Sequence, residues 1–123
     1  MPQPFDDTSP LFLQLAELIR EQVLSRELGE GDSLPSVRQI AHDLSVNHQT
    51  VLKAIQVLTL ENIIEKRRGI GMFVKAGALK ALSSRELQGF IEKDIVAFAD
   101  RAKLLDLTME ELLALVRKEF EGK

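Results

Sequence analysis

The feature that most constrains this chain is a pair of helical patterns separated by only two residues, Ser45 and Val46. The first pattern runs from about Ser36 to Leu44, and the second runs from Asn47 to Asn62. So short a gap makes two helices meet through a tight turn, as in a helix-turn-helix unit whose second helix enters the major groove of DNA. Such pairs also occur by chance in helical proteins, so the spacing alone leaves DNA binding open.

The second of these helices carries different chemistry on its two faces. Apolar residues at positions i, i+3, i+4 and i+7 predict one buried stripe, Val51, Ala54, Ile55 and Leu58. The opposite face holds groups that can meet base edges and phosphates, namely His48, Gln49, Leu52, Lys53 and Gln56. Asn47 is expected to cap the helix, and Asn62 suits the left-handed conformation that ends one. An ordinary amphipathic helix with a solvated polar side is the alternative interpretation.

The segment before this pair predicts one more helix and a loop. Apolar residues recur at helical spacing from Leu11 to about Ser25, after a start at Ser9-Pro10, and the glycines of ELGEGD then interrupt the pattern. Ser36 and Gln39 fit a capping box, in which each side chain accepts a hydrogen bond from the other residue's backbone N–H. This first helix is expected to pack on the core.

Two short β-prone runs, IIEK and MFV, follow the helix pair and enclose the basic turn RRGIG. Together with the helix pair, this hairpin describes a winged helix. Gly69 and Gly71 allow close approach or a positive φ, and Arg67 and Arg68 are expected where the wing meets the sugar-phosphate backbone or the minor groove. A surface hairpin with solvated arginines is the alternative.

The last third of the chain lacks a strand pattern and predicts two helices. Ser83 with Glu86 fits a capping box for the first helix, and Thr108 with Glu111 fits one for the second. Their apolar residues recur four and three apart, as in helices that pack against partners, so a second copy of the chain is the expected partner. Packing of both helices on their own domain is the alternative. The residues of the two seams are Leu87, Ile91, Ile95, Phe98, Ala102 and Leu105, then Leu112, Leu115, Val116 and Phe120.

Charge and composition limit the classes of function. The net charge is -3, yet residues 33–75 hold six basic and three acidic groups, which is the local excess that phosphate contact needs. The absence of cysteine and of any apolar run near the roughly 18 residues that span a bilayer favours a cytoplasmic protein. His42 and His48 form a weak ligand set, so neither a metal nor a cofactor is expected. No catalytic arrangement stands out, and an enzyme is not expected.

These ordered motifs resemble the GntR family of bacterial transcription regulators over Pro10 to Val74. LPSVRQIAHDLSV is similar to the family's second-helix motif, VNHQTVLKAIQVL to its recognition helix, GIGMFV to its wing and PLFLQLAELI to its first helix. The short helical tail resembles the YtrA subfamily, in which two helices after the winged helix serve dimerisation. The resemblance implies a mainly α fold with a small β-hairpin. It implies a winged helix-turn-helix DNA-binding domain over residues 1–75 and a helical dimerisation region over residues 76–123.

The family pattern implies specific DNA contacts at its matching positions. These are Ser36, Arg38, Asn47, His48, Gln49, Thr50, Lys53, Gly69 and Gly71. Many members carry arginine where this chain has His48 and Leu52, and Ile70 replaces the residue, often arginine, between the wing glycines. Base preference therefore cannot be transferred from the family, and Arg67 and Arg68 can compensate for charge near Ile70.

The sequence thus favours a sequence-specific regulator that binds double-stranded DNA as a homodimer. The expected role is repression at a pseudo-palindromic operator, with a transporter operon as the target that the subfamily implies. A small-molecule effector of unknown identity would bind between the helical arms or where they join the winged domain, with Phe90, Phe98 and Phe120 as candidate lining; dimer core is the competing role for these residues. A winged-helix protein-interaction module without DNA binding is the alternative function.

Overall fold

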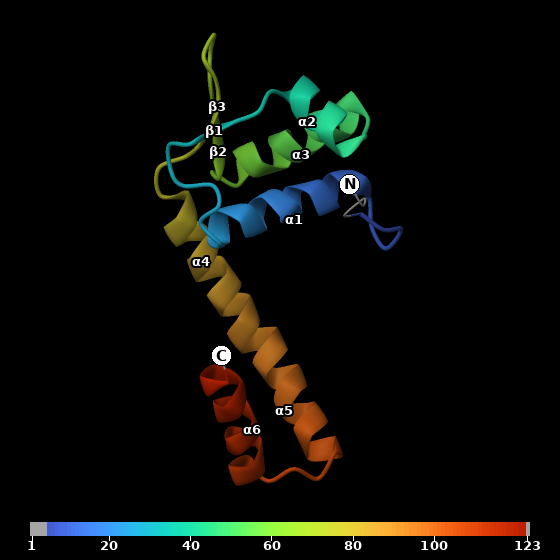
Figure 1. Cartoon of the computed structure of the whole chain (residues 1–123), viewed down its shortest axis with the longest axis vertical. Coiled ribbons are helices and arrows are strands. Elements are labelled where there is room, and N and C mark those ends of the chain that lie inside the picture. Colours follow the sequence, from blue (N-terminus) through green and yellow to red (C-terminus); the bar gives the residue numbers. More distant parts are fainter. Residues whose placement is uncertain (1–4, 123) are drawn as a thin grey trace. The chain divides into compact units, whose positions relative to one another are not determined.

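The computed structural model describes residues 5–122, which form the helices and strands drawn in Figure 1. The described chain forms two compact units, one extending through Ser84 and the other beginning at Arg85. The elements are α1 (Leu11–Leu24), β1 (Ser33–Leu34), α2 (Val37–Leu44), α3 (His48–Leu60), β2 (Ile64–Arg67), β3 (Gly71–Val74), α4 (Ala78–Gly89), the π-helical turn η1 (Phe90–Asp94), α5 (Ile95–Leu104) and α6 (Met109–Glu121).

The helix-turn-helix is confirmed, and its turn is closed by backbone hydrogen bonds. Ser45 takes the left-handed conformation (φ 54°), and the N–H of Val46 donates to the carbonyl of Ala41 at 3.0 Å. Asn47 caps α3 as expected, because its side-chain oxygen accepts from the N–H of Gln49 at 2.7 Å. The predicted stripe is the buried face of α3: Val51, Ala54, Ile55 and Leu58 are all 0% exposed.

The capping box predicted at the start of α2 forms only in part. Ser36 caps α2 by accepting from the N–H of Gln39 at 3.1 Å. The reciprocal bond of a capping box is absent among the described contacts, because the Gln39 amide donates instead to the Asp43 carboxylate at 2.7 Å. Asp43, one turn further along α2, thus competes successfully for the Gln39 side chain.

The wing belongs to a three-stranded antiparallel sheet in the order β1-β3-β2. Ile64 pairs with Val74 and Arg67 with Gly71, so β2 and β3 form the expected hairpin. The third strand, β1, was not predicted from the sequence. Its two residues pair with Phe73 and Met72 of β3, and a strand this short has no periodicity that a sequence pattern could reveal.

The hydrophobic core of the first unit is formed by residues from its helices and its sheet. α1 packs along α3, and the core also takes in the inward residues of the sheet and the start of α4. The expected helix start at Ser83 was wrong, because α4 begins at Ala78 and Ser83 lies inside it. Burial of Ala78 and Leu82 in this core, together with the bond from the Gly77 N–H to the Glu30 carboxylate at 2.7 Å, sets the earlier start.

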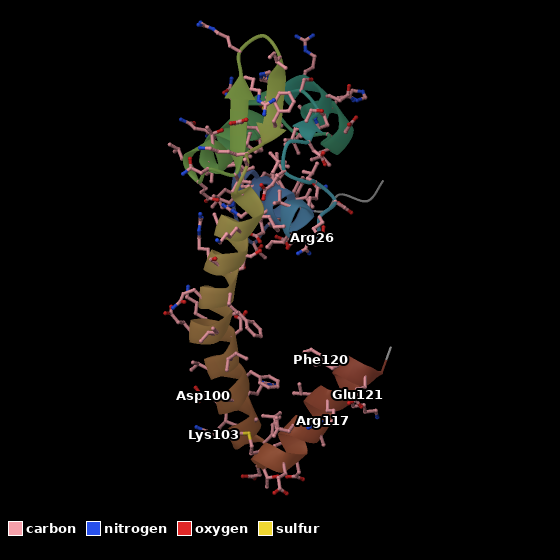
Figure 2. The ribbon with its side chains drawn as sticks, turned by 90° about the vertical axis from the view of Figure 1, so that its left-hand side faces the viewer. Arg26, Asp100, Lys103, Arg117, Phe120 and Glu121 are labelled. Atoms are coloured by element: carbon pink, nitrogen blue, oxygen red, sulfur yellow. The ribbon has the colours of Figure 1, made fainter. Side chains whose placement is uncertain are left out.

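The second unit is helical, and its last helix begins as predicted. Thr108 and Glu111 form the reciprocal capping box, with backbone-to-side-chain bonds of 2.9 and 3.1 Å. Asp106 adopts a positive φ of 59° in the turn between α5 and α6. Figure 2 shows α5 and α6 leaving this turn with their side chains drawn, including Lys103, Arg117 and Phe120.

Apolar side chains of this second unit are largely uncovered within one chain. Phe120 is 86% exposed and Ile95 is 43% exposed, whereas Ala102 of the predicted seam is only 7% exposed. Ala102 is therefore already covered by its own chain. Over residues 5–122, the helices are too short or too polar to cross a bilayer.

Candidate nucleic-acid interface

The polar face of α3 presents several of the side chains that the sequence predicted. His48, Gln49 and Lys53 are exposed, whereas Thr50 is half-buried. The ammonium of Lys53 lies 5.7 Å from the centre of the Phe12 ring of α1, within the range of a cation–π contact. Phe12 therefore limits the positions that Lys53 adopts, a contact that the sequence pattern did not reveal.

The two cap residues of the helix pair already use their side-chain oxygens inside the fold. The Ser36 hydroxyl and the Asn47 amide oxygen accept from backbone N–H groups at the starts of α2 and α3. Both residues thereby fix where their helices begin. Arg38, two residues after Ser36, is exposed on α2.

A groove of about 520 Å³ runs between the start of α2 and the wing. It brings together five of the predicted contact residues, Ser36, Arg67, Arg68, Gly69 and Gly71, and its lining also includes Lys66 and Ile70. The predicted contact residues of α3 are not part of its lining. Sequence reasoning missed Lys66 as a candidate, although it precedes the two arginines in the same basic run.

The wing turn is shaped by two glycines and carries one apolar side chain at its tip. Gly69 and Gly71 have φ values of 77° and 139°, a region that favours glycine. The Ile70 N–H donates to the Arg67 carbonyl at 2.9 Å, and the Ile70 side chain is 71% exposed. The turn therefore projects an apolar residue between basic ones.

The two wing arginines have different surroundings. The Arg67 guanidinium carbon lies 4.2 Å from the centre of the Phe73 ring, and its Nε and Nη2 donate to one oxygen of Glu65 at 3.0 and 2.9 Å. Arg68 is exposed and follows it at the turn. Arg67 is thus held against the hairpin, whereas Arg68 has no comparable side-chain contact among the described residues.

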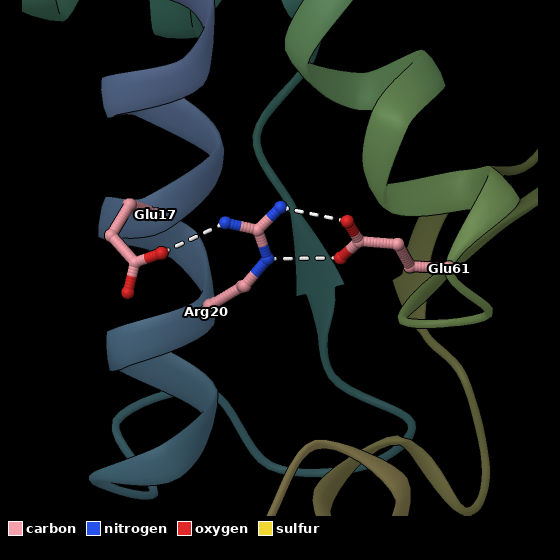
Figure 3. Close-up of polar contacts among 3 residues, drawn as sticks. All are labelled: Glu17, Arg20 and Glu61. Carbon is pink, nitrogen blue, oxygen red and sulfur yellow. Dashed lines mark hydrogen bonds and ion pairs between the residues drawn. The ribbon is translucent and has the colours of Figure 1, made fainter. Parts of the chain in front are cut away.

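The far end of α3 is tied to α1 by a bidentate ion pair (Figure 3). Nε and Nη2 of Arg20 donate to the two carboxylate oxygens of Glu61 at 2.9 and 2.8 Å, and Nη1 reaches Glu17 at 2.8 Å. The bond to Glu61 raises the pKa of the Arg20 guanidinium, against the opposing effect of partial burial. Apolar packing and this ion pair therefore both hold α3, and with it its polar face, in place.

Comparison with known proteins identifies this arrangement. The pattern of the family described as bacterial regulatory proteins, gntR family, matches residues 11–74, which run from the start of α1 to the end of β3. The HTH-type transcriptional regulator YhcF of Bacillus subtilis is 34% identical over 123 residues, covering 99% of each chain. The chain belongs to the GntR family. The family resemblance inferred from the sequence motifs is thereby confirmed.

Two further relatives place this GntR-family chain among regulators of similar build. A GntR family transcriptional regulator from Listeria monocytogenes has a solved structure with a TM-score of 0.76 at 28% identity, covering 93% of this chain and 98% of the other. The HTH-type transcriptional repressor YtrA of Bacillus subtilis is 36% identical over 75 residues. The matched region covers 61% of this chain and 58% of YtrA. The mainly α, winged helix-turn-helix fold class is confirmed.

The side chains presented by α3 and the wing of this GntR-family unit are mostly hydrogen-bonding groups and cations. The described residues 5–122 contain no group of three or more histidine, cysteine, aspartate or glutamate side chains placed to hold a metal ion. The unit offers amide, imidazole and ammonium groups on α3, and guanidinium and ammonium groups at the wing. Groups of these kinds can donate hydrogen bonds to base edges and neutralise phosphates.

Proposed function

We propose that this GntR-family regulator is a homodimeric repressor that binds a pseudo-palindromic operator in double-stranded DNA. The observation that carries the proposal is the exposed polar face of α3, which belongs to the same compact unit as the basic wing. The α3 residues His48, Gln49 and Lys53 would read or position the major groove. The wing would follow the adjacent sugar-phosphate backbone. The cytoplasm, where bacterial DNA lies, is the proposed site of action.

Contacts divide by chemistry into positioning and reading. Lys53, Arg38 and Arg68 would contact phosphates, because an exposed cationic side chain gains from phosphate charge whatever the base sequence. His48 and Gln49 would meet base edges from the first turn of α3. Ser36, Asn47 and Thr50 would act at the helix starts, where the backbone comes near the DNA. Gly69 and Gly71 would let the wing backbone approach closely.

The dimer proposal rests on apolar surface in the second unit. The predicted seam residues Leu87, Ile91, Ile95, Phe98, Leu105, Leu115 and Phe120 are all at least 43% exposed in one chain. Leu112 and Val116 are partly covered, and Ala102 would contribute only at the edge of an interface. Exposed apolar side chains at helical spacing mark interaction sites, and their burial against a second copy is favourable by about 25 cal/mol per Å².

A symmetric dimer would present two recognition helices to one duplex. Half-sites one helical turn apart, about 34 Å, would then be read together, and the operator would share the two-fold symmetry of the protein. The transporter operon implied by the resemblance to YtrA is the proposed target. An effector, where one exists, would act by binding one arrangement of the dimer more tightly than another.

Selection from a random-sequence duplex pool tests this function. The purified chain is expected to enrich sequences with two symmetric half-sites, bound at least about 1,000-fold more tightly than the unselected pool at physiological salt. Lys53→Ala should weaken binding both to the enriched sequences and to the unselected pool. Failure to enrich any sequence would reject a specific regulator and favour the alternative of a winged-helix module that binds protein.

A further inference from the structure

On the outer face of the wing hairpin, charged and aromatic side chains contact one another. In the β2–β3 register, Glu65 is paired with Phe73 and Arg67 is paired with Gly71. Residues two apart on a strand point to the same face, so these four positions share one side of the hairpin. The other side includes Ile64, Met72 and Val74, which are buried in the core.

Each neighbour restrains the Arg67 side chain in a different way. Glu65 accepts two hydrogen bonds from one edge of the guanidinium, at 3.0 and 2.9 Å. Phe73 lies beneath the guanidinium, with 4.2 Å from the guanidinium carbon to the ring centre. Gly71, directly opposite Arg67, has no side chain, so Arg67 can lean diagonally across to Phe73. The arginine is thus oriented even though its side chain is 48% exposed.

This orientation leaves part of the guanidinium available for another partner. An arginine has five N–H groups, and the bonds to Glu65 use one on Nε and one on Nη2. The Nη1 group and the second Nη2 hydrogen remain on the edge that faces away from Glu65. At the same time, the carboxylate offsets part of the positive charge that would attract phosphates regardless of sequence.

From this geometry we propose that Glu65 is a specificity-determining residue that acts through Arg67. Glu65 and Phe73 orient the free edge of Arg67 toward a directed contact with the DNA beside the wing, and Glu65 suppresses non-specific phosphate binding by that arginine. Arg68, the neighbouring exposed arginine, supplies the undirected attraction. The inference rests on the proposed DNA-binding function and deepens it.

Loss of the Glu65 charge should change the affinity for random DNA more than the affinity for selected DNA. Glu65→Gln keeps the shape of the side chain but removes the charge that holds Arg67. Affinity for an unselected random-sequence duplex pool should rise about three- to fivefold, and the salt slope of that binding should steepen by about 0.9. Affinity for the duplex selected by the wild-type chain should rise less, because the freed arginine loses its fixed direction. The ratio of the two affinities should therefore fall.

A double-mutant cycle assigns this effect to the pair. In an Arg67→Gln background, adding Glu65→Gln should leave the affinity ratio unchanged within about twofold, since the group through which Glu65 acts is gone. Glu21→Gln on α1 is the control, because it removes the same charge from an acidic residue outside the wing. Phe73→Leu, which removes the ring beneath Arg67, should lower the ratio as Glu65→Gln does.

Fluorescence anisotropy over a series of salt concentrations, with the selected duplex and the random pool as probes, measures these ratios. Thermal unfolding confirms that each variant is folded before it is compared. An unchanged ratio in Glu65→Gln, or an equal change in the Arg67→Gln background, would overturn the inference while the proposed function stands. Absence of any sequence preference in the wild-type chain would overturn both.

Discussion

Arg20 of α1 and Glu61 at the end of α3 form a bidentate ion pair, with both hydrogen bonds at 2.8 to 2.9 Å. A second contact, Lys53 over Phe12, lies eight residues earlier on both helices. The two helices therefore run in the same direction and are joined near both ends of the shared length, about 12 Å apart at the rise of an α-helix. The polar face of α3 owes its fixed position to these contacts and to the apolar stripe beneath them.

Removing the Arg20 side chain should destabilise the first unit. Its side chain is only 16% exposed and that of Glu61 is 24% exposed, so Arg20→Ala would leave a partly buried carboxylate without its main partner. We expect the free energy of unfolding to fall by about 1–3 kcal/mol in urea titrations. Glu17→Gln, at the 50% exposed partner, should cost less than about 1 kcal/mol. If the two variants lost the same free energy of unfolding, the ion pair with Glu61 would stabilise the fold no more than the contact with Glu17.

The capping box of α6 predicts a pH dependence. Hydrogen bonds from the Thr108 backbone, and secondarily from its hydroxyl, lower the pKa of Glu111 from its usual 4.5. A lowered folded-state pKa stabilises the fold fully above pH 4.5, and this contribution disappears as pH falls through the lower folded value. The stability difference between the wild-type chain and Glu111→Gln should thus be constant at neutral pH and shrink in acid.

Chemical unfolding at several pH values measures that difference. Glu110→Gln changes the same charge in the first turn of α6 and serves as the control for general electrostatic effects. A difference between wild type and Glu111→Gln that stayed constant down to about pH 3 would mean that the capping carboxylate is not a stabilising ion.

Phosphate contact by Lys53 can be detected through the salt dependence of binding. Lys53→Ala should lower affinity for selected and random duplexes alike and reduce the salt slope by about 0.9, the expected value for one phosphate. Phe12→Leu should weaken binding while retaining most of the slope, because the ammonium remains but is less well positioned. Fluorescence anisotropy between low and physiological salt separates the two effects. An unchanged slope in Lys53→Ala would remove this residue from the phosphate contacts.

The apolar seam of the second unit predicts that a charge there breaks the dimer. Ile95 is 43% exposed on α5, and Ile95→Lys would place an ammonium within the proposed interface. We expect sedimentation velocity to show monomers for this variant at concentrations where the wild type is dimeric. Lys103→Ala, on the same helix, should remain dimeric. A wild-type chain that sediments as a monomer would refute the proposed role of the seam.

Local signals explain why the helix-turn-helix could be predicted from the sequence. The Ser45-Val46 gap, the Asn47 cap and the apolar stripe of α3 each depend on neighbours within one or two turns. The Thr108–Glu111 box is equally local and was also predicted correctly. The hairpin of the wing could be located because its glycines and β-prone runs are adjacent in the chain.

Long-range contacts explain what the sequence could not predict. The strand β1 exists only through its pairing with β3, and α4 begins at Ala78 because distant residues bury its first turn and Glu30 accepts from Gly77. The Ser83–Glu86 spacing therefore matched a capping pattern without forming one. The contacts of Arg67 with Glu65 and Phe73 likewise depend on strand register, which pairs Glu65 with Phe73.

The number of chains bound to one selected duplex tests the central claim most directly. Sedimentation of the protein with a fluorescent duplex obtained by selection should show two chains per duplex, and scrambling one half-site should sharply weaken binding. One chain per duplex, or equal affinity for the scrambled DNA, would contradict the proposal that a dimer binds two half-sites at the same time.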